Sequence, residues 1–300
     1  MPHTVGFVLL SHTKPKQVIR LINTLNRMFA NPPIACHHDF TQCDLPSESF
    51  TKNISLVNPH VPTAWGGFSL VEAVLRALQL LYESKNHPDW FILLSGADYP
   101  IKPAERILHD LTTSEYDAHI HHEKIRYNNY DREWQELCHK RYCSLKFRVP
   151  FINKKLELTH RVVTLRHPLL TKPFLPFSKN LSCFAGQQWF AANRKAAKYL
   201  MEYHRIKPAL RSHYRRLDRY NVIPDESYYQ TILCNAANLK VSQNIWRYVD
   251  WSIGGRHPKT LLLEDLPKLN DCSAHFARKF DIDADVAILN TIDKIILNCP

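Results

Sequence analysis

The chain has 300 residues, of which 45% are hydrophobic and 11% aromatic. This composition supports a packed core and excludes a disordered, collagen-like or coiled-coil chain. The longest apolar runs, such as Phe7–Leu10 and Trp90–Leu94, are far shorter than the ~20 residues that cross a bilayer. Because the first residues carry neither a basic segment nor a small-residue cleavage site, we expect a soluble chain in the cytoplasm.

The charge is strongly positive, with 39 Lys and Arg against 28 Asp and Glu, which gives a net charge of +11. A surplus of this size indicates an anionic partner, such as nucleic acid, a lipid head group or a phosphorylated small molecule. The charge is unevenly placed: between Cys138 and Asn180 the sequence has ten Lys or Arg residues and one acid, Glu157. A solvated basic surface is the simplest interpretation of most of these residues.

The eight cysteines form no CxxC pair and have no regular spacing, which argues against a zinc ribbon or a thioredoxin-like site. We expect reduced thiols, as is usual in a cytoplasm, and the alternative is an extracellular chain with disulfides.

The first 120 residues alternate between strand-like and helix-like patterns. The expected strands are Thr4–Leu10, Pro33–His38, Ile54–Val57, Trp90–Leu94 and 117–122. The expected helices are 18–29, a long one that follows Gly66-Gly67 with Ser69 and Glu72 as a capping box, and one from Pro103 to Leu111. This alternation predicts an α/β fold with a mostly parallel sheet flanked by helices.

The second half of the chain is less regular. Residues 123–180 show little periodicity, so we expect loops over the site and one helix near Asp131–Arg141. The later expected elements are ordered structure at Phe184–Ala191, helices at Arg194–His204 and from Pro224, a strand at Ile245–Trp251, and helices at His275–Phe280 and Val286–Leu297. We interpret the chain as a single catalytic domain with two lobes, 1–122 and 123–300.

Polar residues follow three of the expected strands: His12, Asp39 and Asp98. In open α/β sheets the ligand binds beyond the carboxyl ends of the strands, so these side chains could line one crevice. The crevice is not a glycine-loop phosphate site, since the sequence has no GxxxxGK[ST] or GxGxxG motif.

Two histidine clusters, His37-His38-Asp39 and His119, His121 and His122, raise the possibility of a metal site. Adjacent histidines on a strand point to opposite faces, and metal sites usually draw ligands from several elements. We therefore favour polar strand-end residues and predict no metal.

One acidic pair and two cations could carry chemistry. Asp225-Glu226 begins an expected helix, where acids usually stabilise the dipole, but Glu226 could instead act as a general base. Arg256 follows a Gly-Gly turn, and Lys279 lies in a polar break before Phe280. Each could be an ordinary surface charge; together they could neutralise a diphosphate without a metal.

Six motifs occur in an informative order: WGGFSLVEAVLRAL (65–78), FILLSGADYPI (91–101), GQQWFAANR (186–194), IPDESYYQTIL (223–233), RYVDW (247–251) and HFARKFD (275–281). This succession resembles the core-2/I-branching β-1,6-N-acetylglucosaminyltransferases and the related protein xylosyltransferases. The resemblance extends from Thr4 to Asp281, nearly the whole chain. It implies a GT-A-type fold, a UDP-sugar as co-substrate and an inverting transfer to a glycan hydroxyl, with no cofactor.

The resemblance also implies roles for residues. Glu226 is the expected base. Lys279 and Arg256 are the expected ligands of the donor diphosphate, with Lys259 as the alternative to Arg256. His12 and Asp39 would line the nucleoside pocket, and Asp98 would face the donor sugar. The expected acceptor-side residues are Trp189, Trp251, Lys140 and Arg141. The SGAD stretch has one acid where metal-dependent relatives of the fold carry a DxD pair, which agrees with a metal-independent enzyme.

The sequence lacks the N-terminal membrane anchor of familiar animal members, and we expect a cytoplasmic enzyme that glycosylates a polysaccharide or glycolipid, with peripheral membrane contact possible. The donor sugar is expected to be N-acetylglucosamine or xylose. One alternative is a degenerate transferase that binds a nucleotide-sugar without turnover. The other is a basic nucleic-acid-binding protein, which we disfavour because no recognition module is present.

Overall fold

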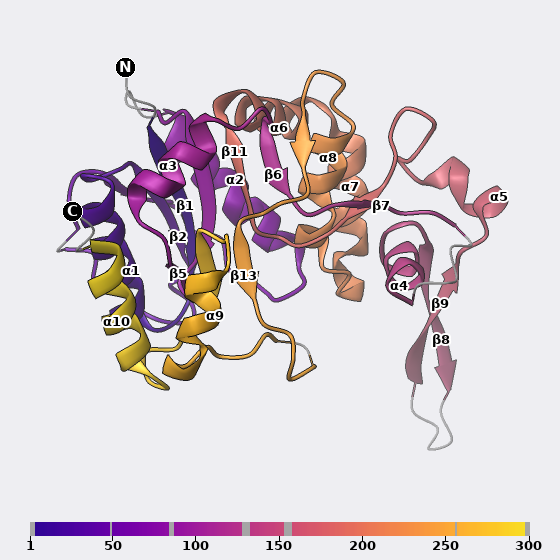
Figure 1. Ribbon diagram of the computed structural model, residues 1–300. Coiled ribbons are helices and arrows are strands. Elements are labelled where there is room, and N and C mark those ends of the chain that lie inside the picture. The colour runs from indigo at the N-terminus through magenta and orange to yellow at the C-terminus, as the bar shows by residue number, and fades with distance from the viewer. Residues whose placement is uncertain are drawn as a thin grey trace.

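A computed structural model describes residues 4–48, 50–83, 87–127, 133–152, 158–255 and 257–297 (Figure 1). Its centre is a seven-stranded sheet with the order β12–β6–β11–β4–β1–β2–β3. These strands are β1 (Val5–Ser11), β2 (Ile34–His38), β3 (Ile54–Leu56), β4 (Trp90–Ser95), β6 (Ala118–Ile120), β11 (Phe190–Asn193) and β12 (Val241–Ser242). Only β11 runs antiparallel to its neighbours in this sheet. The predicted mostly parallel sheet is therefore confirmed.

The sheet is covered on both faces, because alternate side chains of its central strands enter two separate cores. Phe7 and Leu9 of β1 pack with α1 (Pro15–Met28), α3 (Ala104–Thr112), α9 (Leu266–Asp271) and α10 (Val286–Leu297). Val8 and Leu10 pack with α2 (Phe68–Glu83), α6 (Arg194–Ile206), α7 (Pro208–Leu217) and α8 (Tyr228–Cys234). The continuous apolar runs in β1 and β4 are the sequence signature of this two-sided burial.

A second sheet lies beyond the carboxyl end of β4. It consists of β13 (Arg247–Val249), β14 (Phe276–Arg278) and β5 (Asp98–Pro100), in that order. The predicted helix over His275–Phe280 is wrong, because β14 is a strand with partners on both sides. A short apolar run shows no periodicity that distinguishes a strand from a helical turn. Its secondary structure is therefore determined by the strands that pair with it.

A smaller part of the chain projects from the main body (Figure 1). It contains α4 (Glu133–Tyr142), β8 (Leu145–Ile152), β9 (Leu158–Leu165), α5 (Pro168–Thr171) and a 3₁₀ turn at Lys172–Phe174. We call the described residues 133–152 and 158–183 the outer lobe. Two short strands, β7 (Glu123–Lys124) and β10 (Phe184–Ala185), join it to the body. The helix was expected here, and the β8–β9 hairpin was not.

Two further details differ from the expectations. The capping box of Ser69 and Glu72 is not formed: the Asp218 carboxylate accepts from Phe68 N, and Glu72 pairs with Arg215. The basic stretch after α6 is also a helix, α7, whose buried residues include Leu210 and Leu217. Among the residues that the structure describes, no helix is long and apolar enough to cross a membrane. The described cysteines are free thiols.

Candidate active site

The carboxyl ends of β4, β1 and β2 meet at one edge of the sheet, because these neighbouring strands are parallel. His12 follows β1 and is exposed, and Asp39 follows β2 and is fully buried. Asp98, after the turn that follows β4, is also fully buried. The structure thus gathers the three predicted strand-end residues at one edge but leaves only His12 accessible.

Asp39 is surrounded by donors of its own chain. It accepts hydrogen bonds from the backbone and hydroxyl of Thr41, from the Gln42 amide, and from the backbone and hydroxyl of Thr63, at 2.6–3.1 Å. Burial alone would raise the pKa of Asp39, but these bonds outweigh it and lower the pKa. Asp39 therefore fixes the segments around Thr41 and Thr63 beside the sheet edge.

Asp98 is held in a similar way, with a cation added. One carboxylate oxygen accepts from the backbone and hydroxyl of Ser95, the latter at 2.6 Å. The other oxygen lies 2.9 Å from Nη1 of Arg247, whose side chain is 2% exposed. Arg247 also donates to the Leu93 carbonyl at 2.8 Å. Asp98 was expected to face the donor sugar, but it could contact a sugar only if its bond to Ser95 or to Arg247 were broken.

A second buried guanidinium lies beside this pair. This guanidinium belongs to Arg278, which lies opposite Asp98 in the pairing of β14 with β5. Its guanidinium stacks on the Trp189 ring, 4.1 Å from the ring centroid. Burial lowers the pKa of Arg278, and the Asp98 carboxylate raises it in part. Arg278 Nη1 and Arg247 Nε are buried without an acceptor among the described residues.

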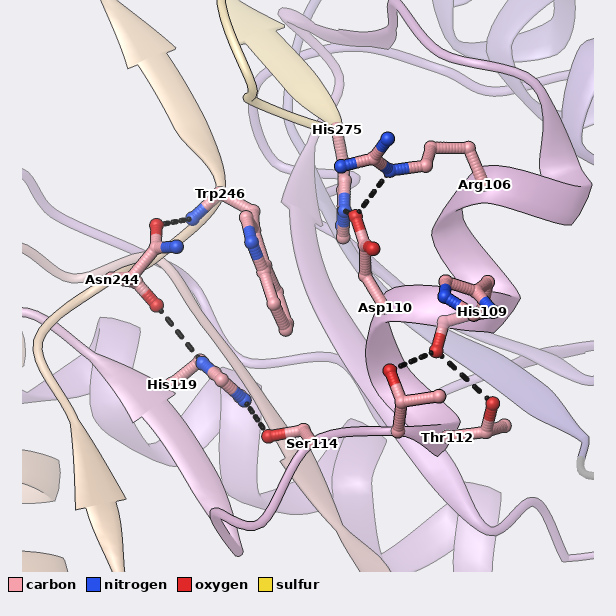
Figure 2. Close-up of polar contacts among 10 residues, drawn as sticks. Arg106, His109, Asp110, Thr112, Ser114, His119, Asn244, Trp246 and His275 are labelled. Atoms are coloured by element: carbon pink, nitrogen blue, oxygen red, sulfur yellow. Dashed lines mark hydrogen bonds and ion pairs between the residues drawn. The ribbon is translucent and has the colours of Figure 1, made fainter.

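An aromatic stack positions the strand that supplies Arg247. Figure 2 shows Trp246, the residue before β13, between His119 and His275, with ring centroids 3.9 and 4.5 Å from its own. His119 bonds to Ser114 and to the Asn244 carbonyl (Figure 2). Burial lowers the pKa of His119 to about 4, so this ring is neutral at pH 7. The cluster is a packing element and leaves His119 unavailable as a metal ligand.

Lys279 directly follows β14 and is half-buried. Its carbonyl accepts from Leu261 N at 2.8 Å, and the next residue, Phe280, donates its N–H to the Ala97 carbonyl at 2.9 Å. The Gln17 amide bonds to both the Gly96 and Phe280 carbonyls, which ties this segment to the turn after β4. Within the described part of the chain, the Lys279 ammonium has no carboxylate at ion-pair distance.

The other predicted cations differ from Lys279. Lys259 pairs with Asp265 at 2.8 Å and Glu264 at 3.4 Å, and the hydrogen bond to Asp265 raises the pKa of Lys259. Arg256 lies outside the described residues. Trp251 follows β13 with 50% of its surface exposed.

Glu226 ends a 3₁₀ turn, Pro224–Glu226, that is fixed on several sides. Its carbonyl accepts from Gly186 N at 2.8 Å, and the Ile223 carbonyl accepts from the Tyr142 hydroxyl at 3.0 Å. The Glu226 side chain stays 39% exposed, with Nη1 of Arg141 at 3.4 Å as its ion-pair partner. Burial raises the pKa of Glu226, and Arg141 offsets part of this rise.

Two glycines make this turn possible by allowing close approach. Gly66 has φ +71°, and a Cβ there would lie 2.0 Å from Oδ1 of Asn221. The Gly66 carbonyl accepts a hydrogen bond from Ile223 N at 3.2 Å. A Cβ on Gly186 would lie 1.9 Å from the His121 carbonyl oxygen. The WGG and GQQW motifs are therefore the backbone supports of Glu226.

The segment from Gly186 to Trp189 connects the acid to the arginine cluster. Gly186 bonds to Glu226, the Gln187 carbonyl accepts from the Gln230 amide at 2.8 Å, and Trp189 stacks on Arg278. Three residues of extended chain span at most about 11 Å. This short segment thus joins the backbone of Glu226 at one end to the Arg278 guanidinium at the other.

Asp225, the neighbour of Glu226, has a different environment. It is 4% exposed, and its Oδ1 has no hydrogen-bond partner among the described residues. Burial raises the pKa of Asp225 to about 7, and the Glu226 carboxylate adds to this effect. Asp225 is therefore largely protonated below neutral pH, whereas Glu226 faces solvent.

On the acceptor side, α4 carries both predicted cations. Lys140 is exposed, whereas Arg141 points to Glu226. Trp189 is half-buried under Arg278. In the described residues no group of three or more His, Cys, Asp or Glu side chains is arranged to hold a metal ion.

Sequence reasoning missed Arg247 and Arg278. Arg278 precedes Lys279 in the HFARKFD motif, and Arg247 opens RYVDW, so the motifs contained the signal. Their closeness to Asp98 depends on the register of β5 with β14 and of β14 with β13, which no local pattern specifies.

Comparisons with known proteins show which proteins this chain is similar to. The family model for the Core-2/I-Branching enzyme matches residues 38–270. The beta-glucuronosyltransferase GlcAT14A of Arabidopsis thaliana is 25% identical over 82% of this chain and 51% of its own length. The xylosyltransferase oxt of Drosophila melanogaster is 25% identical over 82% of this chain and 28% of its own. The chain therefore spans about half, or less, of these relatives.

Two further proteins are similar at lower sequence identity. Xylosyltransferase 1 of Rattus norvegicus is 23% identical over 98% of this chain and 35% of its own length. A solved 4-diphosphocytidyl-2C-methyl-D-erythritol synthase from Anaerococcus prevotii aligns over 90% of this chain with a TM-score of 0.35 and 11% identity. The family model covers most of the chain, and the chain therefore belongs to the Core-2/I-branching enzyme family.

Proposed function

We propose that this chain is an inverting glycosyltransferase of GT-A type that moves a sugar from a UDP-sugar to a hydroxyl of a glycan or glycolipid. The observation that carries the proposal is the state of Glu226. It is a half-exposed carboxylate with a raised pKa and one long ion pair, and it sits on a turn that three separate segments, at Gly66, Tyr142 and Gly186, fix in place.

The proposed reaction is a single displacement. The acceptor oxygen forms a bond to the anomeric carbon while its proton passes to the Glu226 carboxylate. The bond from that carbon to the diphosphate oxygen breaks, and the electron pair leaves with UDP. The raised pKa of Glu226 suits a base that works near neutral pH, because proton transfer is efficient when the pKa lies close to the operating pH.

The leaving diphosphate needs positive charge, since negative charge grows on it as the bond breaks. Lys279 suits this role because its ammonium has no ion pair within the described structure and its backbone adjoins the turn after β4, through the bond from Phe280 N to the Ala97 carbonyl. The family resemblance adds Arg256. Lys259 is a weaker candidate, since its ammonium is already neutralised by Asp265.

We propose that no metal takes part. Asp98 occupies the position of the expected metal-binding acid, but both of its oxygens are held by Ser95 and Arg247. Chelation by Asp98 would leave the Arg247 guanidinium buried without its counter-ion, which is strongly unfavourable.

The remaining predicted residues have proposed roles at the rims of the site. His12 lines the nucleoside pocket and Asp39 fixes the segments around it. The exposed Trp251 indole and Lys140 are available for the acceptor. The donor is proposed to carry N-acetylglucosamine or xylose, and the relatives named glucuronosyltransferases add glucuronate to the set to be tested.

The test is a thermal-shift screen of UDP-N-acetylglucosamine, UDP-xylose and UDP-glucuronate, with and without EDTA, followed by assays of UDP release with added glycan acceptors. One donor should stabilise the fold, because ligands that bind the native state raise the melting temperature by mass action. Stabilisation and transfer should both persist in EDTA. Loss of activity on chelation, restored by manganese, would contradict metal independence; binding without turnover would indicate a degenerate transferase.

A further inference from the structure

The outer lobe exposes an unusual amount of apolar surface. Its exposed large apolar side chains are Leu137, Phe147, Val149, Val162, Val163, Leu169, Leu170 and Phe174. Leu169 is 82% exposed and Phe174 is 64% exposed. Single exposed apolar residues need no explanation, but a concentration of them marks an interaction site.

The β8–β9 hairpin shows that this exposure follows a pattern. Phe147 lies opposite Val163 in the ladder, and Val149 lies opposite Arg161, so these four residues share one face of the hairpin. Arg148 and Val162 are opposed on the other face and are exposed as well, although Arg148 donates to the Arg219 carbonyl of the body. The hairpin therefore exposes apolar side chains on both faces, beside the basic side chains of Arg148 and Arg161.

A basic pocket lies where the outer lobe meets the segment from Lys124 to Tyr127. It has a volume of about 420 Å³ and is lined in part by Lys124, Lys172, Lys179, Tyr127 and His139. Pro168 and Thr171 of α5 form part of its wall, and the two residues between them are the exposed Leu169 and Leu170. None of the three lysines has an ion pair with another described residue.

The outer lobe is mostly positive: its described residues include eight Lys or Arg and two acids, Glu133 and Glu136, of which Glu136 pairs with Arg166. The stretch from Cys138 to Asn180 carries ten Lys or Arg residues and the single acid Glu157. Peripheral proteins are held on anionic membranes by burial of apolar side chains and by attraction of basic residues to the lipid head groups. The outer lobe offers both, because exposed leucines lie beside unpaired lysines on a part that projects from the body (Figure 1).

We propose that the outer lobe docks on the surface of a membrane that contains anionic phospholipids. Leu169 and Leu170 enter the boundary between head groups and acyl chains, and the lysine-lined pocket takes a phosphate head group. This inference does not depend on the proposed reaction. If the reaction holds, docking has a consequence: α4 of the same lobe carries Arg141, which contacts Glu226, so a membrane-borne acceptor would be presented to the base.

The experiment is flotation of the full chain with vesicles of phosphatidylcholine alone and of phosphatidylcholine mixed with phosphatidylglycerol. We expect binding to the anionic vesicles only, weakened by added salt, because ions screen exposed charges. Lys172→Gln and Lys179→Gln should each lower the affinity about fivefold, the equivalent of about 1 kcal/mol for each basic residue near an anionic surface. Leu169→Glu combined with Leu170→Glu should lower it further.

The matched control is Lys294→Gln combined with Ile295→Glu. Both residues are exposed on α10, which lies at the opposite end of the molecule from the outer lobe (Figure 1). This variant should bind like the unmodified chain, and melting temperatures should show that all variants fold. Failure to bind anionic vesicles, or equal binding to neutral ones, would overturn the proposal. Binding to duplex DNA that needs the lysines but not the leucines, without vesicle binding, would instead assign a general polyanion surface.

Discussion

The surroundings of Asp98 and Glu226 differ in almost every respect that decides what a carboxylate can do. Asp98 is completely buried, with Ser95 bound to one oxygen and Arg247 to the other. Glu226 is 39% exposed, and its partner Arg141 is at 3.4 Å. A carboxylate whose hydrogen bonds are already satisfied supports the fold, whereas one with free lone pairs and a raised pKa is available to accept a proton. Substitution of each carboxylate, and of cations that differ in the same way, tests this contrast.

Replacing the base should have the largest effect. Glu226→Gln keeps the size and hydrogen-bonding capacity but removes the proton acceptor, so turnover should fall about 10²- to 10⁴-fold. UDP affinity should stay nearly unchanged, because the substitution acts on the rate rather than on donor binding. Initial rates and UDP calorimetry measure the two quantities. Near-normal turnover would place the base elsewhere, with Asp98 and Asp225 as the next residues to test.

Asp98→Asn should act on stability. The substitution leaves the buried Arg247 guanidinium without its counter-ion, and removal of one partner of a buried pair typically costs about 3 to 5 kcal/mol. Denaturant unfolding measures the loss. Asp283→Asn is the control, since that carboxylate is 77% exposed in its pair with Lys14, and exposed pairs contribute little. If the two variants unfold alike, Asp98 is not the structural acid that its burial indicates.

The same contrast applies to two lysines. Lys279 is unpaired in the described structure, and Lys259 is bound to Asp265. Lys279→Ala should lower turnover about 10²- to 10³-fold, as loss of a well-placed charge-stabilising group does, and should weaken UDP binding less. Lys259→Ala should leave both nearly unchanged. The reverse result would make Lys259 the ligand of the diphosphate.

The sheet could be predicted from sequence because its strands are continuous apolar runs, and burial on both faces requires such runs. The hairpin β8–β9 could not, since its apolar side chains are exposed and alternate with basic ones, so no core periodicity appears. Strand β14 was predicted as a helix because a run of three residues is too short to show the periodicity of either structure. In each case the missing information was the identity of the neighbouring strand.

The site residues that could be predicted from sequence are those that lie in recognisable motifs. Glu226 and Lys279 stand in motifs with a family role, and the structure leaves both side chains available. The pairing of Asp98 with Arg247 joins residues 149 positions apart and depends on the register of a three-stranded sheet. Arg141 was predicted for the acceptor side, and only packing of α4 against the turn at Pro224 shows that it contacts Glu226.

The smallest expected effect is on the pH profile. The Arg141 guanidinium lowers the pKa of Glu226, so Arg141→Gln should raise that pKa further. A base must be ionised to act; the acidic limb of kcat/KM should therefore shift to higher pH, and activity should fall more at pH 6 than at pH 9. At 3.4 Å and partial exposure, the shift should be less than about one unit, because solvent screens the pair.

Arg166→Gln is the matched control for this shift. Arg166 lies in the same lobe and pairs with Glu136 at 2.7 Å, so its loss changes the lobe's charge equally without removing the cation that contacts the base. Its profile should overlay that of the unmodified chain. If Arg141→Gln instead raises KM for the acceptor equally at every pH, Arg141 binds the acceptor rather than setting the ionisation of Glu226. The half-exposed carboxylate would then owe its pKa to burial alone.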